Sequence, residues 1–515
     1  MTKEEMAKAS DIYFNTCAGC HGTTRKGATG PNLLPERIAT IPDSQLFNTI
    51  MYGKPGGMPD WGRQGVLTKD EINLMIKFLH NEPPAPPEMG MEQMYETWKV
   101  YVEPKDRPQK PEHNRNWKNF MGVILRDVGK VAIIDGDTKE LVSIVNTGFA
   151  VHILRSSATG RYFYSIGRDG KVTMIDLWMK KPDKVAEIKV AYDARSVESS
   201  KYKGPEGDFL DKYVVVGGYW PPHLVILDGQ TLEPLKIIST SSYTYDDNEF
   251  MRETRVASIV ASHFEPSWIV NLKEAGIIWI VNYKNLDKGR VDITALDAEK
   301  FLHDGGWDLT KRYFLVAANA MNRVVAIDAK EKKVTAIIAT GNRPHPGRGA
   351  TFHHPKYGNL WLTGHLGENT IACITTPTDG NGTKPWQVVK KIHLPGAGGG
   401  NLFIKTHPKS SHIWADRPLN PDPKLQRSIF VIDKNSLEVI KTIEIPKQFP
   451  GRAVHLEYNK AGDEVWVSVW GKKDQVTAIL VYDDKTLTLK NTITGDWVRT
   501  PTGHFNVYNT VHDIY

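Results

Sequence analysis

One pattern of apolar and polar positions recurs along most of the chain. From about residue 115, an apolar strand that commonly ends in Asp is followed by a polar turn and a second apolar strand. The copies recur about every 50 residues, the size of a four-stranded propeller blade. They are VAIIDGDTKELVSIV, VTMIDLWMKKPDKVAEIKV, LVILDGQTLEPLKII, IWIVNYKNLDKGRVDI, VVAIDAKEKKVTAII, IACITTPTDGNGTKPWQVVKKIHL, IFVIDKNSLEVIKTIEI and ILVYDDKTLTLKNTI. Eight copies predict an all-β, eight-bladed β-propeller, although the fourth and sixth lack the Asp.

The N-terminal region has a helical pattern instead. An apolar stripe at helical spacing follows the capping box Thr68-x-x-Glu71. The stripe comprises Ile72, Met75, Ile76 and Leu79. The run NEPPAPP at 81–87 cannot be helical and predicts an extended spacer. We therefore expect a small all-α domain over 1–82, a Pro-rich linker over 83–114 and the propeller over 115–515.

The segment Cys17-Ala18-Gly19-Cys20-His21 is a C-x-x-C-H motif. Its two thiols form thioethers with porphyrin vinyl groups, and the adjacent imidazole binds the iron. A redox or zinc C-x-x-C is the alternative, but the only other cysteine is Cys373, so no second pair exists to complete a zinc site. The motif predicts a c-type cytochrome with covalent haem c, in which Cys17 and Cys20 hold the porphyrin and His21 the iron.

A low-spin electron-transfer haem needs a sixth ligand, and a thioether raises its potential. Met58 is the candidate, because Gly and Pro residues around it impose a loop that can bring sulfur to the iron. Met51 and Met75 are competitors. Met75, however, belongs to the helical stripe, and a Met at helical spacing is more often part of the core.

Composition and charge narrow the possible functions. Hydrophobic residues at 40%, charged residues at 24% and no apolar run long enough for a bilayer indicate a globular chain that does not span a membrane. The net charge of +6 is scattered along the sequence, which argues against nucleic acid and suits an anionic ligand. The opening MTKEEMAKAS lacks the apolar region of a signal peptide, so we expect that a leader was either removed or replaced.

Several longer segments carry a family resemblance. GFAVHILRSS, FLHDGGWD, RPHPGRGATFHHPKYG, GGGNLFIKTHPKSSHIW and TPTGHFNVYNTVHDIY resemble stretches of the cytochrome cd1 nitrite reductases, in matching order. The resemblance runs from the C-x-x-C-H motif to the last residue. It implies that haem c passes electrons to a non-covalent haem d1, whose iron reduces nitrite to nitric oxide and water. Haem d1, its iron and nitrite as substrate follow from this resemblance, not from the repeats.

The resemblance also assigns three histidines. His152 matches the proximal ligand of the d1 iron, whereas the residues alone would suggest a hydrogen-bonded core histidine. His303 and His345 match a distal pair. Removing one nitrite oxygen as water consumes two protons, and imidazole can hold and release a proton near neutral pH. The alternative for either histidine is a structural role in a propeller loop.

Haem d1 carries several carboxylates, which guanidinium groups bind in bidentate geometry. The matching arginines are Arg126, Arg168, Arg195 and Arg348, with surface salt bridging as the alternative. Tyr219 resembles a pocket tyrosine, and Thr502 and Gly503 resemble residues at the edge of the d1 ring. The chain departs from the family at His455, where a Gln is expected, and only sixteen residues precede Cys17, which argues against a distal tyrosine ligand from an N-terminal tail.

The resemblance further implies a periplasmic enzyme of denitrification, a homodimer, and a small cytochrome c or cupredoxin as electron donor. Two alternatives share this architecture, namely a dehydrogenase of haem d1 biosynthesis and a d1-binding carrier without turnover. The intact FLHDGGWD and PHPGRG segments argue against the dehydrogenase. A quinoprotein dehydrogenase would need a vicinal Cys pair and calcium carboxylates, which the sequence does not show.

Overall fold

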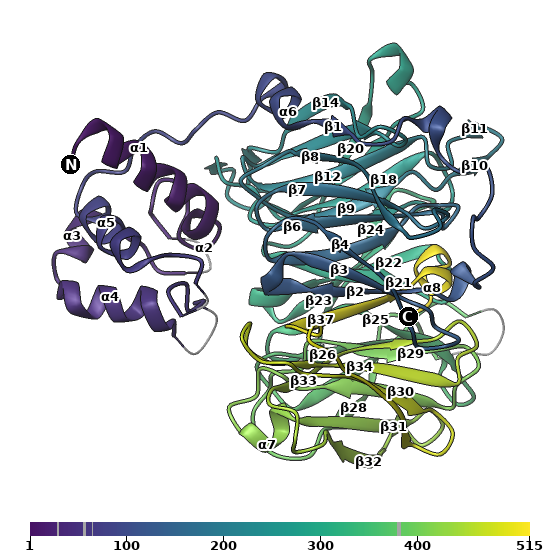
Figure 1. Cartoon of the computed structure of the whole chain (residues 1–515). Coiled ribbons are helices and arrows are strands. Elements are labelled where there is room, and N and C mark those ends of the chain that lie inside the picture. The colour runs from purple at the N-terminus through teal and green to yellow at the C-terminus, as the bar shows by residue number, and fades with distance from the viewer. Residues whose placement is uncertain (28–29, 55–57, 64, 379–382) are drawn as a thin grey trace.

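The structure is a computed structural model that describes residues 1–27, 30–54, 58–63, 65–378 and 383–515. A small helical domain lies beside a large ring of β-sheets (Figure 1). The helical domain begins at Thr2, whose side chain caps the first helix, and a second capping box at Thr68 starts its last helix as predicted. Its helices are α1 (Lys3–Ile12), α2 (Ala18–His21), α3 (Pro35–Ile38), α4 (Asp43–Tyr52) and α5 (Lys69–Leu79), with a π-helical turn at Tyr13–Cys17.

In the described residues, eight sheets of four or five antiparallel strands form the predicted propeller. The first four blades are β37 (Pro501–Asn506), β2 (Met121–Leu125), β3 (Lys130–Ile134) and β4 (Leu141–Asn146); β5 (Val151–Ser156), β6 (Tyr162–Gly167), β7 (Lys171–Asp176) and β8 (Asp183–Lys189); β9 (Asp193–Ser199), β12 (Tyr213–Trp220), β13 (His223–Asp228) and β14 (Pro234–Ser239); and β17 (Val256–Ala261), β18 (Ser267–Leu272), β19 (Ile277–Asn282) and β20 (Asp292–Asp297).

The other four blades follow in chain order. They are β21 (Leu302–Trp307), β22 (Tyr313–Ala318), β23 (Arg323–Asp328) and β24 (Lys333–Ala339); β25 (Pro344–His354), β26 (Gly358–His365), β27 (Thr370–Thr375) and β28 (Val388–His393); β29 (Ile404–Thr406), β30 (His412–Asp416), β31 (Ser428–Asp433) and β32 (Val439–Glu444); and β33 (Arg452–Tyr458), β34 (Glu464–Trp470), β35 (Ile479–Asp483) and β36 (Thr488–Ile493). Two small hairpins, β10 (Lys203–Gly204) with β11 (Gly207–Asp208) and β15 (Ser242–Tyr243) with β16 (Phe250–Met251), extend from the ring.

The Asp of the sequence repeat has a structural cause. Asp228, for example, ends β13 and accepts hydrogen bonds from the backbone N–H groups of Gln230 and Thr231, both at 2.8 Å. This side-chain cap fixes the turn that leads into the outermost strand. Each repeat copy therefore covers the third and fourth strands of one blade, counted from the axis.

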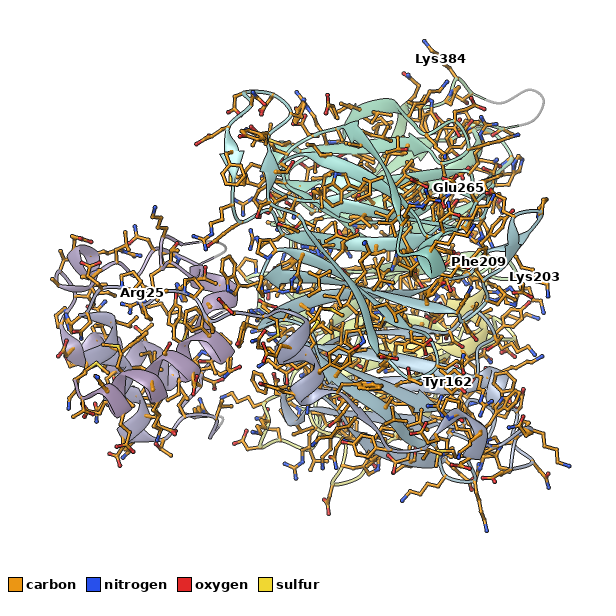
Figure 2. All side chains as sticks on the ribbon, turned by 90° about the horizontal axis from the view of Figure 1, so that it is seen from above. Arg25, Tyr162, Lys203, Phe209, Glu265 and Lys384 are labelled. Atoms are coloured by element: carbon orange, nitrogen blue, oxygen red, sulfur yellow. The ribbon has the colours of Figure 1, made fainter. Side chains whose placement is uncertain are left out.

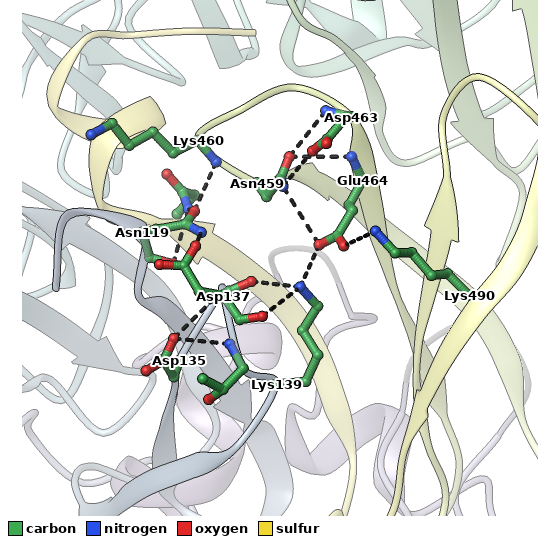
Figure 3. A network of polar contacts seen from close by, with 12 residues as sticks. Asn119, Asp135, Asp137, Lys139, Asn459, Lys460, Asp463, Glu464 and Lys490 are labelled. Atoms are coloured by element: carbon green, nitrogen blue, oxygen red, sulfur yellow. Dashed lines mark hydrogen bonds and ion pairs between the residues drawn. The ribbon is translucent and has the colours of Figure 1, made fainter. Parts of the chain in front are cut away.

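The ring is closed by pairing of the first and last parts of the propeller sequence. The C-terminal strand β37 pairs with β2 and becomes the innermost strand of the first blade. Polar contacts between the first and last blades reinforce this closure (Figure 3): Lys460 N donates to Asn119 Oδ1 at 2.8 Å, and Lys139 Nζ lies 2.6 Å from Glu464 Oε2. After β37, helix α8 (Val507–Val511) and the last residues run along the end of the ring away from the helical domain (Figure 1).

The predicted linker over 83–114 is only partly a spacer. The Pro-rich run is extended, as expected, but helix α6 (Met91–Thr97) follows it and packs against β8 and β14. Strand β1 (Lys99–Val100) then pairs with β8 as a fifth strand. This part of the linker is thus built into the propeller. Within the described residues, no helix is long and apolar enough to cross a membrane.

Candidate functional site

The C-x-x-C-H motif forms a compact turn in the helical domain. Cys17 ends the π-helical turn, and α2 carries Cys20 and His21, so the two thiols and the imidazole lie on one short segment. The His21 Nδ1 lies 2.7 Å from the carbonyl oxygen of Pro31. Because a carbonyl oxygen only accepts, Nδ1 carries the hydrogen, and Nε2 keeps its lone pair for a metal ion. Burial lowers the pKa of His21, which favours the neutral, ligating imidazole.

The three methionine candidates differ in packing. Met51 and Met75 are buried in the core of the helical domain, and the Met51 sulfur packs against Gly62. Met58 is only partly buried at the edge of the same core. Of the loop that carries it, Gly56 and Gly57 lie outside the described residues. The role of Met58 as axial ligand stays a prediction.

Arg25 is a residue that the sequence analysis missed. It is fully buried, and its Nη1 donates to the carbonyl oxygens of Leu79 and Asn81 at 3.2 and 2.8 Å. Within the described residues its Nε and Nη2 have no hydrogen-bond partner, so a buried cation keeps free donors inside the helical domain (Figure 2). A haem propionate would satisfy these donors, so the domain fits the predicted haem c.

A cavity lies within the ring, and β-bulges direct polar side chains into it. The space between its lining residues, together with its opening to solvent, is about 1490 Å³. In the described part of the chain, seven of the eight innermost strands lose pairing register, and such bulges re-aim side chains. Cavity residues at these bulges are His152 in β5, Arg195 in β9, Ser258 in β17, His303 and Asp304 in β21, Arg348 in β25, His455 in β33 and Thr502 in β37.

His152 faces the cavity without a polar partner. Its ring forms no hydrogen bond within the described part of the chain, yet protein surrounds the cavity on most sides. The side chain is exposed to the cavity, but the surrounding protein desolvates the charged imidazolium. This desolvation, with the positive charges of Arg195, Arg168 and Arg126, holds the pKa of His152 well below its usual value. The side chain is thus a neutral imidazole directed at open space, which suits a metal ligand and does not support the core-histidine alternative.

His303 and His345 lie together with Asp304. His303 Nδ1 is 2.9 Å from Asp304 Oδ1, and His345 Nδ1 is 2.9 Å from the carbonyl oxygen of Leu402. These acceptors assign the Nδ1–H tautomer to both rings, so Nε2 is the atom left for other partners. Burial lowers the pKa of His303 to about 4, although Asp304 opposes the shift. Burial would raise the pKa of Asp304, but the two histidines outweigh it and lower that pKa.

His455 is assigned the other tautomer, with the hydrogen on Nε2 instead of Nδ1. Its Nδ1 is 3.3 Å from the backbone N–H of His504 and accepts from it, which leaves Nε2–H as the donor. The buried carboxylate of Asp416, another residue that the sequence analysis missed, accepts hydrogen bonds from the backbone N–H groups of His455, Leu402 and Phe403 at 2.8, 3.0 and 2.9 Å. Burial raises the pKa of Asp416 to about 7 against these hydrogen bonds. Asp416 therefore fixes the wall that also holds His345.

The predicted arginines divide between two places. Arg195 and Arg348 line the cavity, together with Tyr219, Thr502 and Gly503. Arg126 and Arg168 instead line a smaller pocket between the helical domain and the propeller. Arg155, which the sequence analysis missed, also lines the cavity, and its buried Nε has no partner among the described residues. Free guanidinium donors in a cavity of this size fit a ring with several carboxylates.

Tyr13 lies away from the cavity. It is buried in the helical domain, where its hydroxyl donates to the carbonyl oxygen of Gly22 at 2.6 Å. Its ring packs against Phe14 and Phe78. Tyr13 is thus part of the core of the helical domain.

Comparisons with known proteins match both parts of the chain. The family model "Cytochrome D1 heme domain" matches residues 115–510, and "Cytochrome C oxidase, cbb3-type, subunit III" matches residues 4–79. A nitrite reductase of Stutzerimonas stutzeri is 47% identical over 100% of this chain and 95% of its own length. A dihydro-heme d1 dehydrogenase of Pseudomonas aeruginosa is 27% identical over 98% and 94%. A solved dihydro-heme d1 dehydrogenase superposes with a TM-score of 0.75 at 25% identity, covering 98% of this chain and 99% of that chain.

Proposed function

This chain belongs to the cytochrome cd1 nitrite reductases, and we propose that its cavity holds haem d1 with His303 and His345 as the proton donors. The enzyme reduces nitrite by one electron to nitric oxide and water. Haem d1 supplies the iron at which nitrite is reduced, and haem c supplies the electron. Two protons are consumed for each nitrite, so the residues beside the substrate must deliver them.

The cluster of His303, Asp304 and His345 carries this proposal. Positive charge on His303 lowers the pKa of His152, so the two side chains are close enough to interact. The distal cluster and the proposed iron ligand therefore line the same cavity. At neutral pH a buried His303 is uncharged, and an arriving anion would favour its protonated form. Asp304 then stabilises the imidazolium on its Nδ1 side, while Nε2–H can donate to a nitrite oxygen.

The remaining polar residues position the ring. We assign His152 to the d1 iron, and the cavity arginines Arg155, Arg195 and Arg348 to the ring carboxylates. Tyr219, Thr502 and Gly503 line the same space. In the helical domain, Cys17 and Cys20 bind haem c covalently, and His21 and Met58 are the proposed axial ligands. Arg25 is the proposed partner of a haem c propionate.

The cellular setting is part of the proposal. Covalent attachment of haem c normally follows export, which supports a periplasmic enzyme of denitrification. A small cytochrome c or a cupredoxin would reduce haem c, and a homodimer is the expected assembly. Size-exclusion chromatography with light scattering tests the assembly, and reduction rates with each donor type test the partner.

Similarity to the dihydro-heme d1 dehydrogenases supports a second candidate, dehydrogenation of a d1 precursor. Identity favours the reductase, at 47% against 27%. Acid-acetone extraction should remove a green pigment and leave one covalent haem c behind. The purified enzyme should then form nitric oxide from nitrite with a reduced donor. Oxidation of the precursor without nitrite turnover would establish the second candidate.

A further inference from the structure

The haem attachment loop docks on a carboxylate of the propeller. A Cβ atom added to Gly19, inside the C-x-x-C-H motif, would collide with the carboxylate of Asp193. Beside this contact, Arg168 Nη2 donates to Cys20 Sγ at 3.2 Å. The glycine is therefore required here for the close approach of a propeller side chain, and the helical domain meets the propeller at its haem-binding segment.

Asp193 also contacts the wall of the cavity. It begins β9, is 3% exposed, and its Oδ2 lies 3.2 Å from Nη2 of Arg195 and 3.7 Å from Nη2 of Arg168. Arg195 sits in the bulge of the same strand, and its guanidinium lies 4.5 Å from the ring centre of Tyr219. Contacts therefore run without a gap from Cys20 through Arg168 and Asp193 to Arg195 in the cavity.

The charges around Asp193 explain why the carboxylate matters. Burial lowers the pKa of Arg126, and the positive charges of Arg168 and Arg195 lower it further, so three guanidinium groups are close enough to repel one another. Arg126 has its own partner, Asp127, at 2.6 Å. Asp193 is the carboxylate that contacts both Arg168 and Arg195. Without it, two half-buried cations would lose their shared counter-charge, which would leave their mutual repulsion uncompensated.

We infer that Asp193 is a positioning residue that holds the haem c attachment loop against Arg168 and Arg195, and that electron transfer between the two domains depends on it. The inference rests on the proposed function, because it takes Arg195 as part of the d1 site. In the step concerned, haem c loses one electron and haem d1 gains it, with no bond formed or broken. The carboxylate keeps the donor loop and the acceptor wall in one fixed arrangement.

The test uses the holoenzyme with Asp193→Asn, which keeps the shape but removes the charge. Haem c is reduced rapidly by a photochemical donor, and the d1 absorption is followed afterwards. Loss of the charge that holds the loop should separate donor and acceptor, so we expect interdomain transfer to slow about tenfold or more while haem c reduction keeps its rate. Asp193→Glu should restore part of the rate, and Gly19→Ala should slow it because the methyl group displaces the carboxylate.

Glu253→Gln is the matched control. Glu253 accepts a hydrogen bond from Thr23 at 2.9 Å, a contact between the domains that does not involve Asp193. The control should transfer electrons at the wild-type rate. Hydrogen exchange of residues 13–21 in protein without d1 should accelerate in Asp193→Asn alone. Equal slowing in Glu253→Gln, or wild-type transfer and exchange in Asp193→Asn, would overturn the inference. Absence of haem c to d1 transfer in the wild type would instead refute the proposed function.

Discussion

His303 and His345 face each other with ring centres 5.0 Å apart, and the carboxylate of Asp304 lies 2.9 and 3.6 Å from their Nδ1 atoms. One anion thus serves two imidazoles. Burial disfavours the charged form of His303, so an anion bound between the rings would favour its protonation, and Asp304 would stabilise the resulting imidazolium.

The first prediction concerns this pair. His303→Ala and His345→Ala should each reduce nitrite turnover by roughly 10²-fold or more, the usual contribution of a positioned acid, with d1 still bound. Steady-state nitric oxide formation and the red absorption of d1 measure the two properties. His353→Ala, a histidine outside the cavity, is the control. Wild-type turnover in both cavity variants would refute the proton-donor role, and loss of d1 in both would favour a structural role.

Met58→His tests the axial ligand of haem c. Imidazole donates more strongly than a thioether and lacks its preference for ferrous iron, so the haem c potential should fall substantially. Spectroelectrochemical titration of the c band measures it. Met75→Leu alters a buried core methionine and should leave the potential near that of the wild type. An unchanged potential in Met58→His would assign the ligand to another residue.

Arg155→Met tests the assignment of the free guanidinium in the cavity. A charge-assisted hydrogen bond is worth about 1.5–3 kcal/mol, so d1 should bind roughly 10- to 100-fold more weakly. Titration of d1-free protein with extracted d1 measures the affinity. Arg323→Met is the control. Arg323 Nη1 lies 2.6 Å from Glu299 Oε2, and this ion pair does not line the cavity. Equal d1 affinity in Arg155→Met and wild type would exclude Arg155 from carboxylate binding.

His223 should make stability depend on pH. It is 4% exposed, its Nε2 lies 2.8 Å from the carbonyl oxygen of Val190, and burial lowers its pKa to about 4. As pH falls from 6.5 to 4, the unfolded chain takes up a proton that the folded chain rejects, so stability decreases by on the order of 3 kcal/mol. Denaturant unfolding across this range should give a smaller decrease for His223→Gln. An equal slope in His223→Gln and the wild type would contradict the prediction.

The sequence predicts the outer half of each blade and little of the inner half. In most copies the first strand of the repeat ends in an Asp, such as Asp228 or Asp328, whose side chain caps the following turn by a local rule. The innermost strands carry bulges at different residues, including His152 and His455, and therefore share no common pattern. The residues that form the site are those that break the repeat, so the family resemblance, and not periodicity, identified them.

Neither the sequence repeat nor the family resemblance predicted some of the site residues. Asp416 acts through the backbone of Leu402, and no side-chain motif marks that role. Arg168 lies near the haem thiol instead of in the cavity, because its loop leaves the propeller on the side of the helical domain. Pairings between side chains far apart in sequence, such as Asp193 with Gly19, require the folded arrangement.

The pairing of β37 with β2 has a consequence for biogenesis. The last residues of the chain complete the first blade and also line the cavity, through Thr502 and Tyr515. During synthesis, the propeller therefore remains an open arc with a split pocket until β37 has emerged and paired with β2. A protein truncated before residue 501 would lack this pocket wall, so binding of a ligand in the cavity would report that the ring has closed.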